Sequence, residues 1–112
     1  MAMTPMVKHN GWKYVGEQTG TNALSYPSSA SEIYIKTTWN NDFSYFHEFY
    51  MPIISLNAGI SYCETGAYRS SNDNGAVIIK IDANNRTVAL NKNIYGGQDV
   101  TSTSKTALYY RE

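Results

Sequence analysis

The sequence predicts an all-β fold, an antiparallel β-sandwich or jelly roll of about six to eight short strands. Apolar and polar residues alternate with a period of two along much of the chain. No stretch keeps the spacing of an amphipathic helix, and polar turn clusters recur between the alternating segments. At 112 residues the chain has the length of one domain. We expect a flexible tail at residues 1–10 and a single sandwich domain at 11–112.

The first expected strands are residues 12–15 and 31–39. Residues 12–15 are short and aromatic, and the closing residues 106–111 are their expected partner. Residues 31–39 alternate strictly, so an aliphatic inner stripe begins with Ile33 while Tyr34 faces the other side. These strands are expected to close the domain and to supply part of its core.

Residues 43–56 are rich in aromatic and aliphatic side chains and carry Pro52 near their middle. Proline cannot donate to a β-ladder, so we expect this segment to bend at Pro52 or to lie at a sheet edge. A bend there would allow one strand to feed two sheets.

Residues 61–68, 75–82 and 86–91 predict a three-stranded antiparallel meander. The middle strand has Val77, Ile79 and Ile81 on its inner face. An Asn-Gly step precedes this strand and an Asp-Ala-Asn-Asn cluster follows it, and both are typical of tight turns.

Charge and composition exclude several classes of partner. The chain has nine basic and nine acidic side chains, so no summed positive field is available to bind nucleic acid. Its longest apolar run, residues 51–54, is far shorter than the roughly 20 residues of a membrane span. No signal peptide is visible at the start, and the single Cys63 cannot form an intrachain disulfide. We therefore expect that the chain is synthesised in a reducing cytoplasm and does not insert into a membrane.

The usual sequence signatures of catalysis, metal binding and cofactor binding are missing. His47 precedes Glu48, but neighbours on a strand point to opposite faces. Cys63 and the two histidines lack the spacing of zinc ligands, and residues 70–75 match a calcium loop only in part. Gly96-Gly97 is expected to be a turn. We predict no enzyme, no metal and no cofactor.

One catalytic alternative stays open, a small glycoside hydrolase with a carboxylate pair that has no recognisable spacing. Such an enzyme needs a cleft that holds a carboxyl group of raised pKa. The candidate carboxylates are Glu32, Asp42, Glu48, Glu64 and Asp82.

The positive signal for function is the abundance of aromatic side chains, with ten tyrosines and two tryptophans. Their flat apolar faces and polar handles suit sugar stacking and protein interfaces, although most of them are expected in the core and in cross-strand pairs. Candidate ligand-binding residues lie opposite an aliphatic stripe or beside polar loops. They are Tyr34, Trp39, Asn41, Tyr68, Arg69 and Asp73.

Four segments resemble a β-rich C-terminal domain of phage and prophage tail-associated proteins, of fibre or baseplate, from low-GC Gram-positive bacteria. They read GWKYVGE at 11–17, LSYP at 24–27, EIYI at 32–35 and ALYYR at 107–111. The likeness spans nearly the whole chain and rests on hydrophobic and glycine positions, without an invariant chemical motif. It implies a virion component, made in the bacterial cytoplasm, that forms a homotrimer and contacts other virion proteins and host cell-wall saccharides. The family supplies no catalytic residue.

The leading prediction is therefore a non-catalytic structural or receptor-binding module of a phage tail that presents aromatic and amide side chains. The first alternative is a stand-alone carbohydrate-binding module of a bacterial enzyme or surface protein. That module would be monomeric and would show one exposed aromatic platform, whereas the tail module would be an oligomer.

Overall fold

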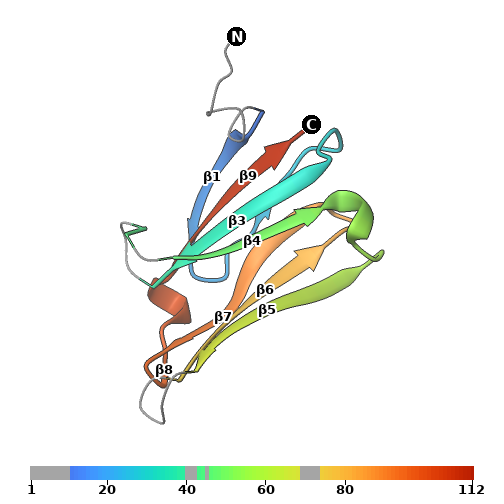
Figure 1. Ribbon diagram of the computed structural model, residues 1–112. Helices are drawn as coiled ribbons and strands as arrows, with labels where there is room; N and C mark the ends of the chain where they lie inside the picture. The colour runs from blue at the N-terminus through green and yellow to red at the C-terminus, as the bar shows by residue number, and fades with distance from the viewer. Residues whose placement is uncertain (1–10, 40–42, 45, 69–73) are drawn as a thin grey trace.

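The computed structural model describes residues 11–39, 43–44, 46–68 and 74–112, with only the backbone described at 65–68 and 74. Within these residues, two antiparallel sheets pack together as a β-sandwich (Figure 1). The described part has seven strands of six to nine residues and two strands of two residues. The predicted all-β antiparallel sandwich is confirmed.

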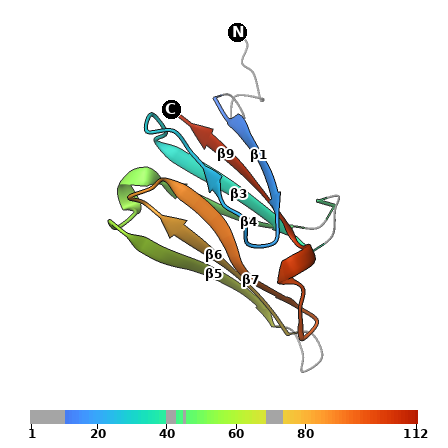
Figure 2. The same ribbon diagram turned by 180° about the vertical axis from the view of Figure 1, so that it is seen from behind.

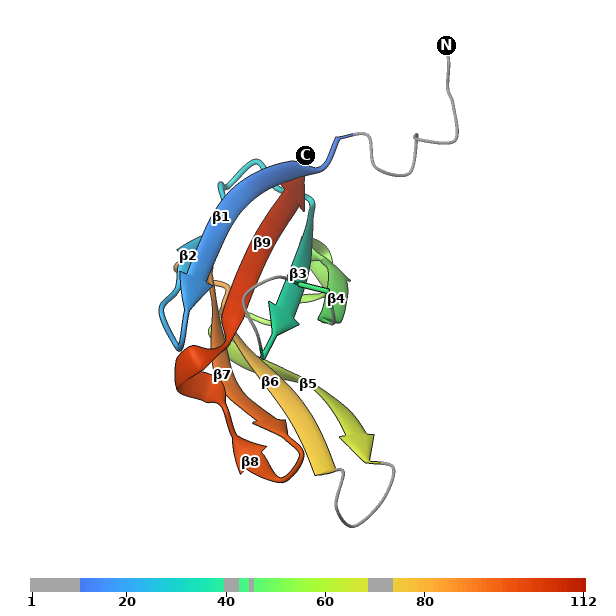
Figure 3. The same cartoon turned by 90° about the vertical axis from the view of Figure 1, so that its left-hand side faces the viewer.

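The first sheet has the strand order β1-β9-β3-β4. Its strands are β1 (Lys13–Thr19), β9 (Lys105–Arg111), β3 (Glu32–Thr38) and β4 (His47–Pro52). Figure 3 shows β1 curving along β9, so the predicted pairing of the aromatic start and end of the chain is confirmed. Pro52 ends β4 opposite Glu32, at the sheet edge, where β4 has one neighbouring strand instead of two.

The second sheet has the order β2-β7-β6-β5, with β8 added to β7. Its strands are β2 (Leu24–Ser25), β7 (Thr87–Tyr95), β6 (Asn74–Asp82), β5 (Ile60–Tyr68) and β8 (Gln98–Asp99). β5, β6 and β7 form the predicted meander. A 3-10 turn, η2 (Ile53–Ser55), lies between β4 of the first sheet and β5 of the second. The prediction that one strand takes part in both sheets is therefore wrong, because η2 ends β4 before the chain crosses from the first sheet to the second.

The core lies between the facing sides of the two sheets. The aliphatic side chains of β3 and β6 that were predicted to face the core are buried, with Ile33, Ile35, Val77 and Ile79 at 0% exposure. This outcome follows from the two-residue period of a strand, which places every second side chain on one face. The other members of the buried cluster are Leu24, Tyr26, Ala30, Phe49, Ile81, Val88, Leu90 and Leu108.

A polar network closes the sandwich beside β8. Figure 2 shows the 3-10 turn η3 (Thr101–Thr103) between the β7–β8 hairpin and β9. Buried Asn93 donates to the hydroxyl of Ser104 at 3.0 Å, and Ser104 donates to the carbonyl of Val100 at 2.7 Å. The hairpin turn is Gly96-Gly97, whose φ angles of 59° and 79° lie in the left-handed region that favours glycine. The predicted turn at these glycines is confirmed.

Candidate binding face

Each strand of the first sheet contributes one tyrosine to its outer face at the same register. Tyr14 of β1 lies opposite Tyr109 of β9, which lies opposite Tyr34 of β3, and Tyr34 lies opposite Tyr50 of β4. We call these four side chains the tyrosine row. The row crosses the whole sheet perpendicular to the strands, on the side away from the core.

The rings of the tyrosine row contact one another along the row. The ring centroids are 5.3 Å apart for Tyr14 and Tyr109, 5.5 Å for Tyr109 and Tyr34, and 4.4 Å for Tyr34 and Tyr50. The last pair is stacked with an interplanar angle of 20°. Because the inner rings are covered by their neighbours, the outer ones are the most accessible, with Tyr14 56% and Tyr50 61% exposed.

Trp12 extends the aromatic surface along one side of the tyrosine row. Its ring centroid lies 5.8 Å from Tyr34 and 6.0 Å from Tyr50. The guanidinium of Arg111 lies 4.6 Å from the Trp12 ring and also forms an ion pair with Glu32 at 2.7 Å. A guanidinium held by both a carboxylate and an indole is fixed in orientation, and this fixes the tryptophan.

A lysine and a phenylalanine lie on the opposite side of the row. Lys36 is two residues beyond Tyr34 on β3, and its Nζ lies 4.8 Å from the ring of exposed Phe46. The same Nζ lies 5.6 Å from the ring of Tyr109 and 5.9 Å from that of Tyr34. A cation therefore borders the aromatic surface on each side, Arg111 beside Trp12 and Lys36 beside Phe46.

Tyr34 is held by hydrogen bonding as well as by stacking. Its hydroxyl donates to Glu48 of β4 at 2.7 Å. Burial raises the pKa of Tyr34, and the hydrogen bond to the Glu48 carboxylate raises it further. Burial also raises the pKa of Tyr14, with a smaller contribution from Glu17. Both phenols remain protonated donors at neutral pH.

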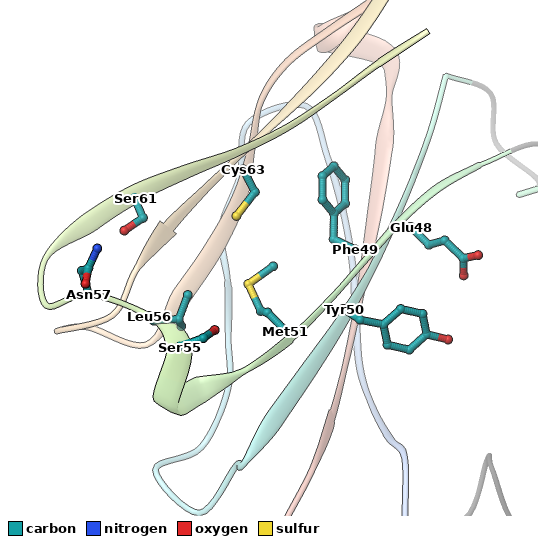
Figure 4. Close-up of a pocket in the computed structure, with 9 residues that line it drawn as sticks. All are labelled: Glu48, Phe49, Tyr50, Met51, Ser55, Leu56, Asn57, Ser61 and Cys63. Carbon is teal, nitrogen blue, oxygen red and sulfur yellow. The ribbon is translucent and has the colours of Figure 1, made fainter.

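A groove of about 500 Å³ runs between the edge strands β4 and β5. Figure 4 shows Phe49 and Met51 pointing from β4 towards Cys63, while Glu48 and Tyr50 point to the other side of β4. Burial raises the pKa of the Cys63 thiol, so the neutral, weakly nucleophilic form dominates at neutral pH. Cys63 packs against the core, as expected of a small hydrophobic side chain.

The predicted ligand-binding residues do not all come together. Tyr34 lies within the tyrosine row, whereas Trp39 lies five residues further along the chain, about 16 Å away in an extended strand. There Trp39 stacks on Tyr95 of β7, with centroids 4.9 Å apart and planes at 15°. The backbone of Tyr68 belongs to β5 in the other sheet. The Tyr68 side chain, Asn41, Arg69, Asp73 and the tail at 1–10 lie outside the described residues.

Five aromatic residues of the face were not singled out from the sequence as ligand-binding. These are Trp12, Tyr14, Phe46, Tyr50 and Tyr109. The alternation of each strand indicates which face a tyrosine occupies, but it does not indicate which strands are neighbours. The row needs both pieces of information.

The groups considered for catalysis are spread over the sandwich. His47 lies opposite Thr37, whose side chain is buried on the core side, whereas Glu48 lies opposite Lys36 on the outer face. This separation was predicted from the strand geometry. Burial lowers the pKa of His47. Among the described residues no group of three or more His, Cys, Asp and Glu side chains is arranged to hold a metal ion.

The carboxylates considered for hydrolysis lie on both sheets. Glu32 belongs to β3, Glu48 to β4, Glu64 to β5 and Asp82 to β6, while Asp42 lies outside the described residues. Hydrogen bonds from Asn85 lower the pKa of Asp82. A general acid needs the opposite shift.

Two further carboxyl groups have a lowered pKa. Hydrogen bonding to Thr101 lowers the pKa of Asp99, and hydrogen bonding to Lys13 lowers the pKa of Glu112.

None of the helices in the described part of the chain is long and apolar enough to span a membrane. Comparisons with protein-family models, curated proteins and solved structures gave no match.

Proposed function

We propose that this chain is a non-catalytic binding module and that its tyrosine row, together with Trp12, binds a saccharide. The observation that carries the proposal is one tyrosine per strand, in register, on the face that points away from the core. Saccharides present apolar C–H faces and many hydroxyls, and phenol rings offer both an apolar face and a hydrogen-bonding group. Packing against neighbours holds the rings before a ligand arrives, which reduces the entropy lost on binding.

The charge balance of this face supports a saccharide over a nucleic acid. Lys105 lies 3.7 Å from Glu17, and Arg111 lies 2.7 Å from Glu32. A phosphate backbone is attracted by an excess of positive charge, and paired cations supply little of it. Hydroxyl-rich ligands do not need such an excess.

For the biological setting we propose a phage or prophage tail, in line with the sequence resemblance. There the module acts as a structural or receptor-binding part of a fibre or baseplate, in the virion, and meets a host cell-wall saccharide. Light scattering across a concentration series tests this setting. A stable trimer supports it, whereas a strict monomer supports the second candidate, a stand-alone carbohydrate-binding module, which the exposed aromatic face also favours.

Tyr50→Ala tests the saccharide proposal directly. Tyr50 is 61% exposed at the edge of the first sheet, so its removal should leave the core intact. Glycans that bind the wild-type protein on a glycan array would be titrated by calorimetry, and we expect Tyr50→Ala to weaken binding about tenfold, because it removes an aromatic ring that contacts the ligand.

Tyr62→Ala is the matched control, because Tyr62 is 60% exposed on β5 of the other sheet. We expect this variant to bind like the wild type. Equal losses in the two variants, or no glycan bound by the wild type, would refute the saccharide proposal. Chromatography of the glycan after incubation checks the non-catalytic part, and we expect intact glycan. Cleavage products would favour the hydrolase.

A further inference from the structure

The cationic side chains on the outer face of the first sheet differ in their surroundings. Arg111 is paired with Glu32, and Lys105 with Glu17. Lys36 forms no ion pair with any carboxylate among the described residues. Of the cations that border the tyrosine row, it is therefore the one that has no carboxylate within ion-pair distance in the described part of the chain.

Aromatic rings surround the ammonium group of Lys36 instead of carboxylates. Its Nζ lies between 4.8 and 5.9 Å from the ring centroids of Phe46, Tyr109 and Tyr34. Ring faces attract a cation, but they do not replace the oxygen acceptors that the three N–H donors of an ammonium prefer. Rings also displace water from the sides of the cation, which strengthens its attraction to an anion.

Glu48 is the cross-strand neighbour of Lys36, but its carboxylate has another partner. The hydroxyl of Tyr34 donates to it at 2.7 Å. This hydrogen bond ties the Glu48 carboxylate to the tyrosine row. A ligand group that lies beside Phe46 contacts the ammonium of Lys36, whereas a group that lies over Tyr34 meets the Glu48 carboxylate.

We infer that Lys36 binds an acidic substituent of the saccharide, a carboxylate or a phosphate, while the sugar rings lie on the tyrosine row. The inference rests on the proposed saccharide-binding function and names its substrate class, an acidic oligosaccharide. An ammonium is a compact point charge on a flexible stem, so both a uronate carboxylate and a sugar phosphate fit. The other cations near the row are already neutralised by their carboxylates.

Calorimetry with three hexasaccharides tests this inference on the wild-type protein. The first is a uronic acid hexasaccharide, the second is the same chain with its carboxyl groups reduced to alcohols, and the third is a neutral hexasaccharide that carries one phosphate. At low ionic strength we expect the uronate to bind about fivefold more tightly than its reduced form. The phosphate arm shows whether the site takes carboxylates alone or both anions. The preference should shrink in high salt, because the ion pair is partly exposed.

Variants at Lys36 assign the preference to one side chain. We expect Lys36→Gln to reduce the affinity for the uronate to that for the reduced sugar, and to leave the affinity for the reduced sugar unchanged. Lys36→Arg keeps the charge and should keep most of the preference. Lys80→Gln on β6 is the matched control in the other sheet, with no expected effect.

The outcomes separate this inference from the proposed function. If the wild type binds the uronate and the reduced sugar equally, or if Lys36→Gln retains the preference, the inference is refuted and saccharide binding stands. If none of the three hexasaccharides binds and the glycan array is also empty, the proposed function fails and the inference fails with it. Circular dichroism of Lys36→Gln, with Lys36→Arg as a folded comparison, excludes unfolding as the cause of a loss.

Discussion

The hydroxyl of Tyr34 and the carboxylate of Glu48 form a 2.7 Å hydrogen bond that runs diagonally between β3 and β4. In the ladder, Tyr34 lies opposite Tyr50 and Glu48 lies opposite Lys36, so the bond joins neighbouring rows of side chains. β4 pairs with β3 and is an edge of the first sheet. Stacking of Tyr34 on Tyr50 and this hydrogen bond therefore both attach the edge strand through the outer face.

The first prediction concerns this hydrogen bond. Tyr34→Phe keeps the ring and removes the hydroxyl, so we expect the free energy of unfolding to fall by about 1 kcal/mol. Urea denaturation measures the change. A double-mutant cycle with Glu48→Ala isolates the pair, and strictly additive losses would show that the bond contributes nothing to stability.

Alkaline pH should destabilise the fold through its tyrosines. The pKa values of Tyr34, Tyr14 and Tyr26 are all raised, mainly by burial. The unfolded chain loses these protons near the ordinary tyrosine pKa of about 10, while the folded chain still holds them. Through these groups, the free energy of unfolding should not change with pH below about pH 9, and it should fall as the pH rises past about 10.

Denaturation curves recorded from neutral pH into this alkaline range test the expectation. Tyr34→Phe removes one of the shifted groups, so its stability should fall less steeply with pH than that of the wild type. A wild-type stability that stays level across the tyrosine titration, or an unchanged slope in Tyr34→Phe, would contradict the assignment.

Of the two asparagines in β7, Asn93 should contribute more to the stability of the fold. Its side chain is 3% exposed and donates to Ser104, while its backbone N–H donates to the hydroxyl of Thr101 at 2.9 Å. Asn93→Ala leaves the buried hydroxyl of Ser104 without this donor, and we expect a loss of about 1–3 kcal/mol in thermal or urea denaturation.

Asn91→Ala is the control for this prediction. Asn91 is exposed and lies at the bulge, between the residues that face Ile78 and Ile79. Its replacement should change stability by less than about 0.5 kcal/mol. Similar losses in both variants would show that the network around Asn93 adds nothing beyond the backbone ladder.

Replacing a buried and an exposed isoleucine by alanine compares the contribution of core packing to stability with that of a surface side chain. Ile79 is 0% exposed at the centre of the meander, and Ile54 of η2 is 95% exposed. Ile79→Ala should lower the free energy of unfolding by about 2–5 kcal/mol, because it leaves a cavity. Ile54→Ala should lie within about 0.5 kcal/mol of the wild type. Chemical denaturation of both proteins decides, and a large loss in Ile54→Ala would indicate an additional contact for that side chain.

Local patterns account for much of the sandwich. Alternation placed Ile33 and Ile79 on inner faces, and short polar turns joined residues 61–68, 75–82 and 86–91 into the meander that the structure contains. These features depend on residues close together in the chain, where strand geometry and turn chemistry act directly. The edge position of the strand that carries Pro52 was anticipated from the missing N–H donor of proline.

The candidate site was only partly accessible to such reasoning. Tyr34 was singled out because it lies opposite an aliphatic stripe, and it belongs to the tyrosine row. Trp39 was grouped with it, yet it stacks on Tyr95 at a distance along the strand. Proximity in the chain did not translate into a common surface, because residues on one strand separate by about 3.3 Å each.

The sequence by itself determined which side of the strands at 31–39 and 75–82 faces the core, since strict alternation follows the two-residue period of the backbone. Only the tertiary structure decided that β1, β9, β3 and β4 are neighbours in this order. That order brings together Tyr14, Tyr34, Tyr50 and Tyr109, which are widely separated in the chain. A shift of one residue in any of these pairings would turn a tyrosine to the other face, so the row exists because packing of the whole core selects a single register.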